Sequence, residues 1–433
     1  MSNSLRIPLY AGLVALLILG TGVVQGWNSA LLILNMGLVS AIMALGVNLQ
    51  WGFAGLFNVG VMGFVALGGL ATVLVAMDPV RPAWDAGGAG ILTAMVLGAA
   101  TIVAAILTFR AAPSQWRGWA TFAVLVVGFI IYRSVFIPAR DAVEAVDPAA
   151  TGFLGGLGLP VVLAWPIGGL LAAGAAWIIG KTALGLRSDY LAIATLGIAE
   201  IIIAIMKSED WLSRGVKNVN NIPRPVPDAA ELQADPAFVA FASDWGFGVV
   251  DAANISIKLG YSAMFAVVLV ALLILAQLAL NSPWGRMMRA IRDNETAAGA
   301  MGKNVTRRHL QIFILGSAIC GIAGAMMTTL DGLLVPGTYQ PLRYTFLIWV
   351  MVIVGGSGNN YGAVIGGFLV WWLWVQVEPM GAALLGAITS LMPEGSALAD
   401  HLMDSAAHMR LLTMGLVLLL VLRFSPRGLV PER

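Results

Sequence analysis

Charged residues are scarce in this chain. Asp, Glu, Lys and Arg make up 11% of its 433 residues, whereas hydrophobic residues make up 59%. A soluble domain carries about 25% charged residues, which help to cover its surface in water. A surface that faces lipid needs no such cover, so the composition predicts an integral membrane protein.

Cysteine and histidine are also nearly absent. The single cysteine, Cys320, lies in an apolar segment, so neither an internal disulfide nor a paired-cysteine metal site can form. His401, Asp404 and His408 recur at i, i+3 and i+7, but no further ligand is near, and a solvated helix face explains the pattern better. The net charge of +2 gives no broad basic face for nucleic acid. We therefore expect no metal, no cofactor and no nucleic-acid partner.

A phosphate-binding loop is missing as well. The segment AAWIIGKT (175–182) comes close to one, but Ala175 stands where the first glycine is needed. The segment also lies in an apolar run rather than after a strand. No Ser/His/Asp or paired-carboxylate constellation stands out. We predict that the chain is not an enzyme and that any ATP hydrolysis belongs to separate chains.

Apolar runs recur along the whole chain, and a membrane-crossing helix needs about 20 such residues. They predict an all-α, polytopic membrane helix bundle with eleven or twelve transmembrane helices. The first run predicts a retained span rather than a signal peptide, because no clear cleavage site follows it. A short run at 381–392 is left open as re-entrant or interfacial. The predicted spans are 8–26, 30–50, 54–77, 91–109, 118–137, 160–180, 188–206, 261–280, 310–330, 343–358, 361–378 and 409–424.

Charge in the loops predicts the orientation, because Lys and Arg collect on the cytoplasmic side. The loop 281–310 carries six basic residues against two acidic ones, and the loop 110–117 is also basic. Alternating spans place both loops on one side, together with the two chain ends. The acidic segments 78–85 and 141–147 and the long Pro-rich loop 207–260 fall on the other side. We expect cytoplasmic N- and C-termini and a periplasmic loop at 207–260.

The basic loop 281–310 has the pattern of a short helix at its start. Pro283 suits a first helical position, and Trp284, Met288 and Ile291 then fall on one face. This pattern predicts an amphipathic helix along the inner membrane surface.

A second short helix is expected after the first. Asp293 or Asn294 can cap it, Glu295 suits its first turn, and Gly302 stands where a left-handed C-terminal cap is needed. Ala297 and Ala298 are small, so a partner surface can approach closely. The unit suits docking into a groove on a partner, although a solvated basic loop that only fixes topology fits equally well.

The segment NETAAGAMG (294–302) resembles the coupling loop of ATP-binding-cassette (ABC) importers, which carries an E-A-A-x-x-x-G pattern. Ala297, Ala298 and Gly302 match that pattern, and Glu295 stands one residue earlier. The chain resembles the LivM type of branched-chain amino acid ABC transporter permease.

Other segments resemble signatures of the same family in the same order. One stretch departs from it: LSRGVKNVNNIPRP (212–225) stands where the family often has Thr-Gly-Gly-x-x-Gly-Ile. The resemblance covers most of 30–431 except 78–160, which we predict to be an inserted region with two extra spans in a single permease domain, 1–433. The matching segments are ALGVNLQWGFAGLFNVGVMGFVALGG (44–69), LRSDYLAIATLGIAEII (186–202), VIVGGSGNNYGAVIGG (352–367) and RFSPRGLVP (423–431).

The resemblance implies a permease of the bacterial inner membrane and a set of partners. These are two cytoplasmic ABC ATPase subunits docked on the 281–310 loop, a second homologous permease and a periplasmic substrate-binding protein. The implied cargo is a branched-chain or other hydrophobic amino acid, with urea or a short amide as the alternative. An ion-coupled secondary transporter is the alternative of another class, and the scarcity of ionisable residues in the spans counts against it.

Three polar residues in apolar segments are candidates for the translocation pathway. Glu200 lies inside a span, where a charge must face protein or water, so it either lines a path or bonds to a neighbouring helix. Asn48 and Asn58 either line a polar route or cross-link helices. The glycine runs at 52–69 and 355–367 indicate close helix packing or, less commonly, broken helices.

Overall fold

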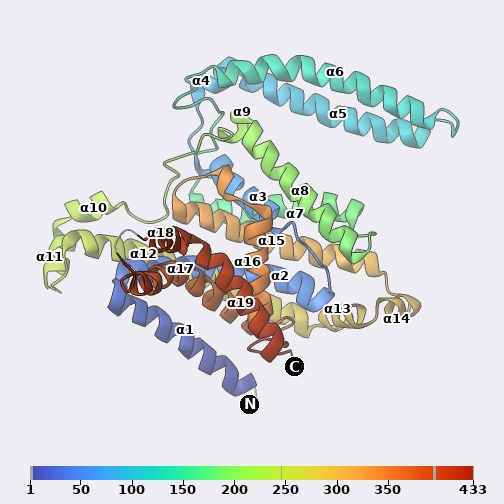
Figure 1. The fold of residues 1–433 in the computed structure, drawn as a ribbon. Coiled ribbons are helices and arrows are strands. Elements are labelled where there is room, and N and C mark those ends of the chain that lie inside the picture. The colour runs from blue at the N-terminus through green and yellow to red at the C-terminus, as the bar shows by residue number, and fades with distance from the viewer. Residues whose placement is uncertain (1–2, 245, 394–395, 433) are drawn as a thin grey trace.

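The computed structural model describes residues 3–244, 246–393 and 396–432, and within them the chain is a bundle of helices without a β-strand (Figure 1). This confirms the predicted all-α membrane architecture. Each of the twelve predicted spans coincides with a helix.

Nine helices of the described chain are long and apolar enough to cross a membrane. α18 (Ala397–Asp404) and α19 (Met409–Phe424) form a bent pair that would be a tenth span. The estimate of eleven or twelve spans also counts two shorter apolar helices, α3 (Val61–Ala76) and α16 (Pro341–Gly355). The long helices are α1 (Asn3–Gln25), α2 (Trp27–Val47), α5 (Ala89–Ala111), α6 (Arg117–Glu144), α7 (Ala164–Ala183), α8 (Ser188–Ser208), α12 (Val249–Asn281), α15 (Val305–Asp331) and α17 (Asn360–Thr389).

Some boundaries differ from the predicted ones. α12 starts at Val249, twelve residues before the predicted 261. Its first turns mix polar and apolar residues, so they do not belong to a continuous apolar run. α3 starts at Val61 rather than at 54. The run 381–392 is no separate element, since α17 continues to Thr389 through Pro379. A proline is tolerated within a membrane helix when neighbouring helices satisfy the backbone around it.

Short helices mark the two ends of the bundle (Figure 1). α13 (Pro283–Asp293) and α14 (Glu295–Ala300) lie at one end, and α10 (Ala229–Ala234) and α11 (Pro236–Asp244) lie at the other. Both chain termini lie near the α13 end, where Arg6 Nη1 donates to the carbonyl of Leu429 at 3.3 Å.

Helices α5 and α6 form a hairpin that stands apart from the rest of the bundle (Figure 1). They are preceded by α4 (Arg81–Ala83) and the π-turn η2 (Trp84–Gly88). The hairpin is fixed at its base, where Phe136 packs edge-on against Trp211 of α9 (Asp210–Ser213) with ring centroids 5.8 Å apart. Most of its remaining surface is exposed and apolar, as expected for a surface in lipid.

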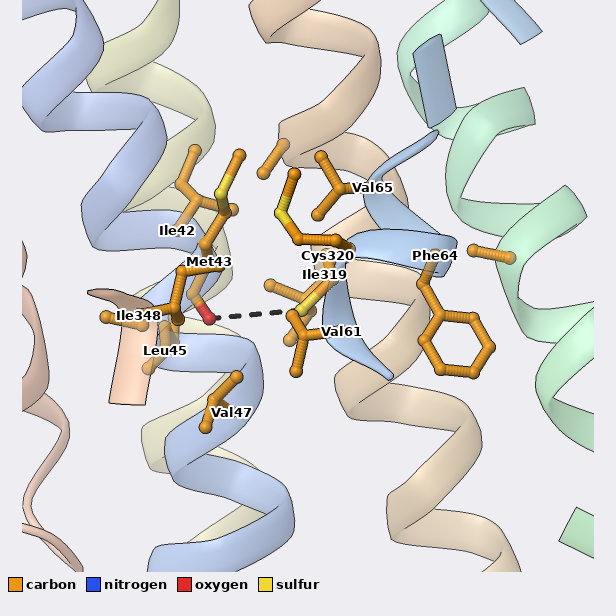
Figure 2. Close-up of a cluster of buried hydrophobic side chains, with 14 of the residues drawn as sticks. Ile42, Met43, Leu45, Val47, Val61, Phe64, Val65, Ile319, Cys320 and Ile348 are labelled. Carbon is orange, nitrogen blue, oxygen red and sulfur yellow. Dashed lines mark hydrogen bonds between the residues drawn. The ribbon is translucent and has the colours of Figure 1, made fainter. Parts of the chain in front are cut away.

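Helices α2, α3, α7 and α15 form the tightly packed centre. A Cβ on Gly68 would lie 1.9 Å from the carbonyl oxygen of Gly321, so glycine at this position is what lets α3 and α15 approach so closely. Figure 2 shows the buried side chains between these helices, with the Sγ of Cys320 3.9 Å from the carbonyl oxygen of Met43. Cys320 is therefore a small core residue.

Candidate coupling site at one end of the bundle

The helix that begins as α2 is broken inside the bundle. It passes into a π-turn, η1 (Asn48–Gly52), and residues 55–60 are irregular before α3 begins. Gly55 adopts φ +70°, and a Cβ on Gly60 would lie 2.2 Å from the carbonyl oxygen of Thr195. The glycines of this run therefore serve both a broken helix and close packing.

Buried amides hold this break in place. Gln50 donates to the carbonyl of Phe313 at 2.9 Å and to the hydroxyl of Ser317 at 3.0 Å. Its side-chain oxygen accepts from Asn58 Nδ2 at 2.9 Å. The carbonyl of Asn58 in turn accepts from the indole of Trp349 at 3.1 Å. Asn58 is almost fully buried, so it cross-links this segment to its neighbours; a pathway role for it stays a prediction.

Asn48 joins the break to the turn between α16 and α17. Its side-chain oxygen accepts from the backbone N–H of Gly358 at 2.9 Å, and its nitrogen donates to Asn360 Oδ1 at 3.0 Å. The C-terminal tail folds onto the same turn through backbone hydrogen bonds from Leu429 and Val430 to the end of α16. Three signatures that lie far apart in the sequence therefore meet at one place.

Arg292, at the end of α13, connects the predicted coupling loop to this junction. Its guanidinium donates to the carbonyl of Gly52 in the break and pairs with Glu432 of the tail at 2.9 Å. Burial lowers the pKa of Arg292, but hydrogen bonds and charge from Glu432 and Asp293 outweigh burial and raise the pKa above its ordinary value. The side chain is therefore a fixed cation that ties the loop to the break.

Helix α14 has the predicted caps and no buried residue. Asn294 Oδ1 accepts from the backbone N–H of Ala297 at 2.9 Å. Gly302 adopts φ +77°, and the backbone N–H of Lys303 closes the helix by donating to the carbonyl of Ala298 at 3.1 Å. Met301 beside it is 80% exposed. The unit is capped at both ends and presents small and apolar groups outward.

The apolar face of α13 packs differently from the expectation. Met288 and Ile291 are fully buried against the chain's own spans, and the indole of Trp284 donates to Gln311 of α15 at 3.2 Å. The predicted amphipathic helix is present, but the expectation that its apolar face lies in lipid is wrong. Amphipathicity shows that one face needs an apolar partner, and here the bundle is that partner.

Glu200 lies apart from the junction. Its side chain is exposed on α8, as are those of Ile193 and Ile201, and it has no hydrogen bond or ion pair within the described residues. The structure therefore bonds Asn58 to Gln50 in η1 and bonds Asn48, in the same turn, to the turn between α16 and α17, but it leaves Glu200 on an outer surface.

Sequence reasoning missed several residues of the junction. Gln50, Arg292 and Glu432 were not singled out, although all three carry its contacts. The sequence distinguishes these residues only weakly. Gln50 is one more polar residue between the candidates Asn48 and Asn58, and Arg292 is one of six basic residues in the loop 281–310.

The fold is that of a polytopic membrane helix bundle with an exposed, capped helix unit tied to a broken span. A family model described as "Branched-chain amino acid transport system / permease component" matches residues 118–422, and this chain belongs to that family. The permeases of this family are transport subunits and not themselves enzymes.

Individual relatives are more distant. The chain is 29% identical over 208 residues to the high-affinity branched-chain amino acid transport system permease protein LivM of Escherichia coli K12, covering 47% of this chain and 48% of that one. It is 26% identical over 280 residues to a probable LivM of Methanocaldococcus jannaschii, covering 65% and 70%. The xylose transport system permease protein XylH of Escherichia coli K12 is 24% identical over 282 residues, covering 59% and 58%.

The chain spans about half the length of the first LivM relatives that it matches. No solved structure matches it.

Proposed function

We propose that the chain is the transmembrane permease subunit of an ABC importer that moves branched-chain or other hydrophobic amino acids across the bacterial inner membrane. The observation that carries this proposal is the exposed α14 unit, tied through Arg292 to the break between α2 and α3. A force applied to such a unit reaches the interior of the bundle directly. The LivM relatives support the cargo class.

The proposal assigns a partner to each end of the bundle. Two cytoplasmic ATPase subunits would dock on the 281–310 loops, one on this chain and one on a second, homologous permease. The N- and C-termini would share that cytoplasmic side. The segment 207–260 at the opposite end would meet a periplasmic substrate-binding protein. The α5–α6 hairpin would be an addition to a single permease domain.

The exposed carboxylate of Glu200 supports a second permease. A charge at the bilayer centre costs about 2.5–3.5 kcal/mol on insertion scales, so it should face protein or water rather than lipid. Glu200 is exposed on an apolar span, with Gly197 and Ala204 small and exposed on the same side. A second permease covering α8 would remove this charge from lipid and leave it beside the path between the two chains.

Replacing Glu200 with glutamine tests that placement. We expect Glu200→Gln to leave assembly intact and to slow amino acid uptake several-fold, because the amide keeps the size and loses the charge. Uptake into cells or proteoliposomes measures it, and Asp189→Asn, an exposed carboxylate in the first turn of the same helix, is the matched control. Wild-type uptake by Glu200→Gln would contradict a role in the path.

Purification of the tagged chain from its own host tests the proposed assembly. We expect two ATPase chains, a second permease and, with a crosslinker, a periplasmic binding protein to copurify. Recovery of the chain alone, with uptake that collapses when the proton or sodium gradient is removed, would indicate an ion-coupled secondary transporter instead.

A further inference from the structure

A separate cavity of about 140 Å³ lies among α2, α3, α15, α16 and α17. Its wall is mostly apolar, and Leu347, Ile348 and Trp371 contribute to it. Methionine is flexible and polarisable, so a methionine wall adapts to apolar groups of different shape. The methionines that line it are Met36, Met43, Met62, Met327 and Met351.

Asp331 is the one charged side chain among the described residues that line this cavity. It is the last residue of α15, its side chain is exposed, and it makes no hydrogen bond or ion pair within the described chain. An unpaired carboxylate beside an apolar wall favours a ligand that carries one positive group and one apolar group.

The size of the cavity limits the apolar group. An engineered apolar cavity of about 150 Å³ binds benzene, so this one has room for a branched aliphatic side chain. A sugar is a poor fit, because each of its buried hydroxyls would need a hydrogen-bond partner. The uncharged polar side chains in the wall are those of Ser40, Thr338, Tyr344 and Trp371.

The side of the cavity that Asp331 lines is near the segment that departs from the family pattern, 212–225. The residues after Asp331 pair with that segment: Val219 and Leu334 exchange backbone hydrogen bonds of 3.1 and 2.8 Å, and the N–H of Ile222 donates to Gly332 at 3.1 Å. Because α15 begins at Val305, just after α14, the end of α15 that carries Asp331 is opposite α13 and α14.

We infer that this cavity is a cargo site in which Asp331 binds the ammonium group of an amino acid and the methionine wall holds its small apolar side chain. The inference rests on the proposed function for the direction of transport, but the binding itself needs no ATPase. In the proposed orientation the site lies on the side from which cargo arrives. It selects amino acids over sugars.

The test is equilibrium binding of radiolabelled L-leucine to the purified full-length chain in lipid nanodiscs, with competitors. We expect 3-methylbutylamine, which keeps the amine, to compete, and 4-methylpentanoate and xylose to compete poorly. Asp331→Asn should weaken leucine binding by about tenfold or more, because hydrogen bonds to charged groups are the strong ones. The control Asp228→Asn, an exposed carboxylate at the same end that does not line the cavity, should bind as the wild type does.

A second variant separates a binding defect from misfolding. Met327→Phe narrows the cavity, so it should weaken binding of leucine more than binding of the smaller valine, a change in ratio that misfolding does not produce. Absence of leucine binding, wild-type binding by Asp331→Asn, or preference for xylose would overturn the inference. If the chain copurifies with ATPases but does not bind leucine, the cargo site is wrong and the proposed function stands. If the chain binds leucine but has no ATPase partners, the proposed function is wrong and the cargo site stands.

Discussion

Uptake should fall to background when Gly302 is replaced by valine, while the amount of chain in the membrane stays unchanged. Gly302 adopts φ +77°, and a β-branched residue in this region costs about 1–2 kcal/mol. The strain acts on the turn that closes α14, so the docking surface changes shape. Because α14 buries no residue, the bundle should keep its fold. Transport assays and membrane fractionation measure the two effects.

A matched glycine is available at the other end of the molecule. Gly26, between α1 and α2, has φ +93°, and a Cβ added there, as at Gly302, would meet open space, so Gly26→Val introduces similar strain away from α14 and outside the segment 207–260. We expect this control to transport normally. Ala298→Trp should reproduce the Gly302→Val defect by steric blockage without backbone strain. Normal uptake in both Gly302→Val and Ala298→Trp would rule out docking at this loop.

The bundle could be predicted because lipid imposes a strong rule on sequence: each crossing must be a long apolar helix. The break before α3 could not be predicted in the same way. Glycines between Gly52 and Gly60 permit either a continuous, closely packed helix or an irregular segment. The choice depends on hydrogen bonds that Val59 and Asn58 donate to Thr195 and Gln50, and on one that Asn58 accepts from Trp349. The tertiary fold sets the positions of Thr195 and Trp349.

The candidate site was partly predictable for a similar reason. The caps of α14 are local, so spacing alone predicted Gly302 at the C-terminal cap and limited the N-cap to Asp293 or Asn294. The surface that covers an amphipathic helix is set by residues far away in the sequence. The pattern of α13 therefore predicted an apolar face but could not show that this face packs on the bundle rather than on lipid. The Arg292–Glu432 pair joins residues 140 positions apart, and nothing in the local pattern distinguishes Arg292 from its basic neighbours.

Loss of the Arg292 guanidinium should uncouple transport from ATP hydrolysis. Removing one partner of a charged hydrogen bond costs about 1.5–3 kcal/mol, and Arg292→Gln removes the links to both Gly52 and Glu432. We expect the ATPases still to copurify, because α14 is untouched, while uptake per ATP hydrolysed falls at least about tenfold. Uptake and phosphate release from the same proteoliposomes measure this ratio.

Two further variants identify which contact of Arg292 transmits the motion. Arg286→Gln removes a guanidinium from the same helix that bonds only to the carbonyl of Asn281 within the described chain, so coupling should be normal. The swap of Arg292→Glu with Glu432→Arg restores the ion pair but not the hydrogen bond to Gly52. Recovery in the swap would assign coupling to the tail, and no recovery would assign it to the break. Wild-type coupling in Arg292→Gln would show that motion of α14 reaches the bundle by another route, such as the packing of Met288 and Ile291.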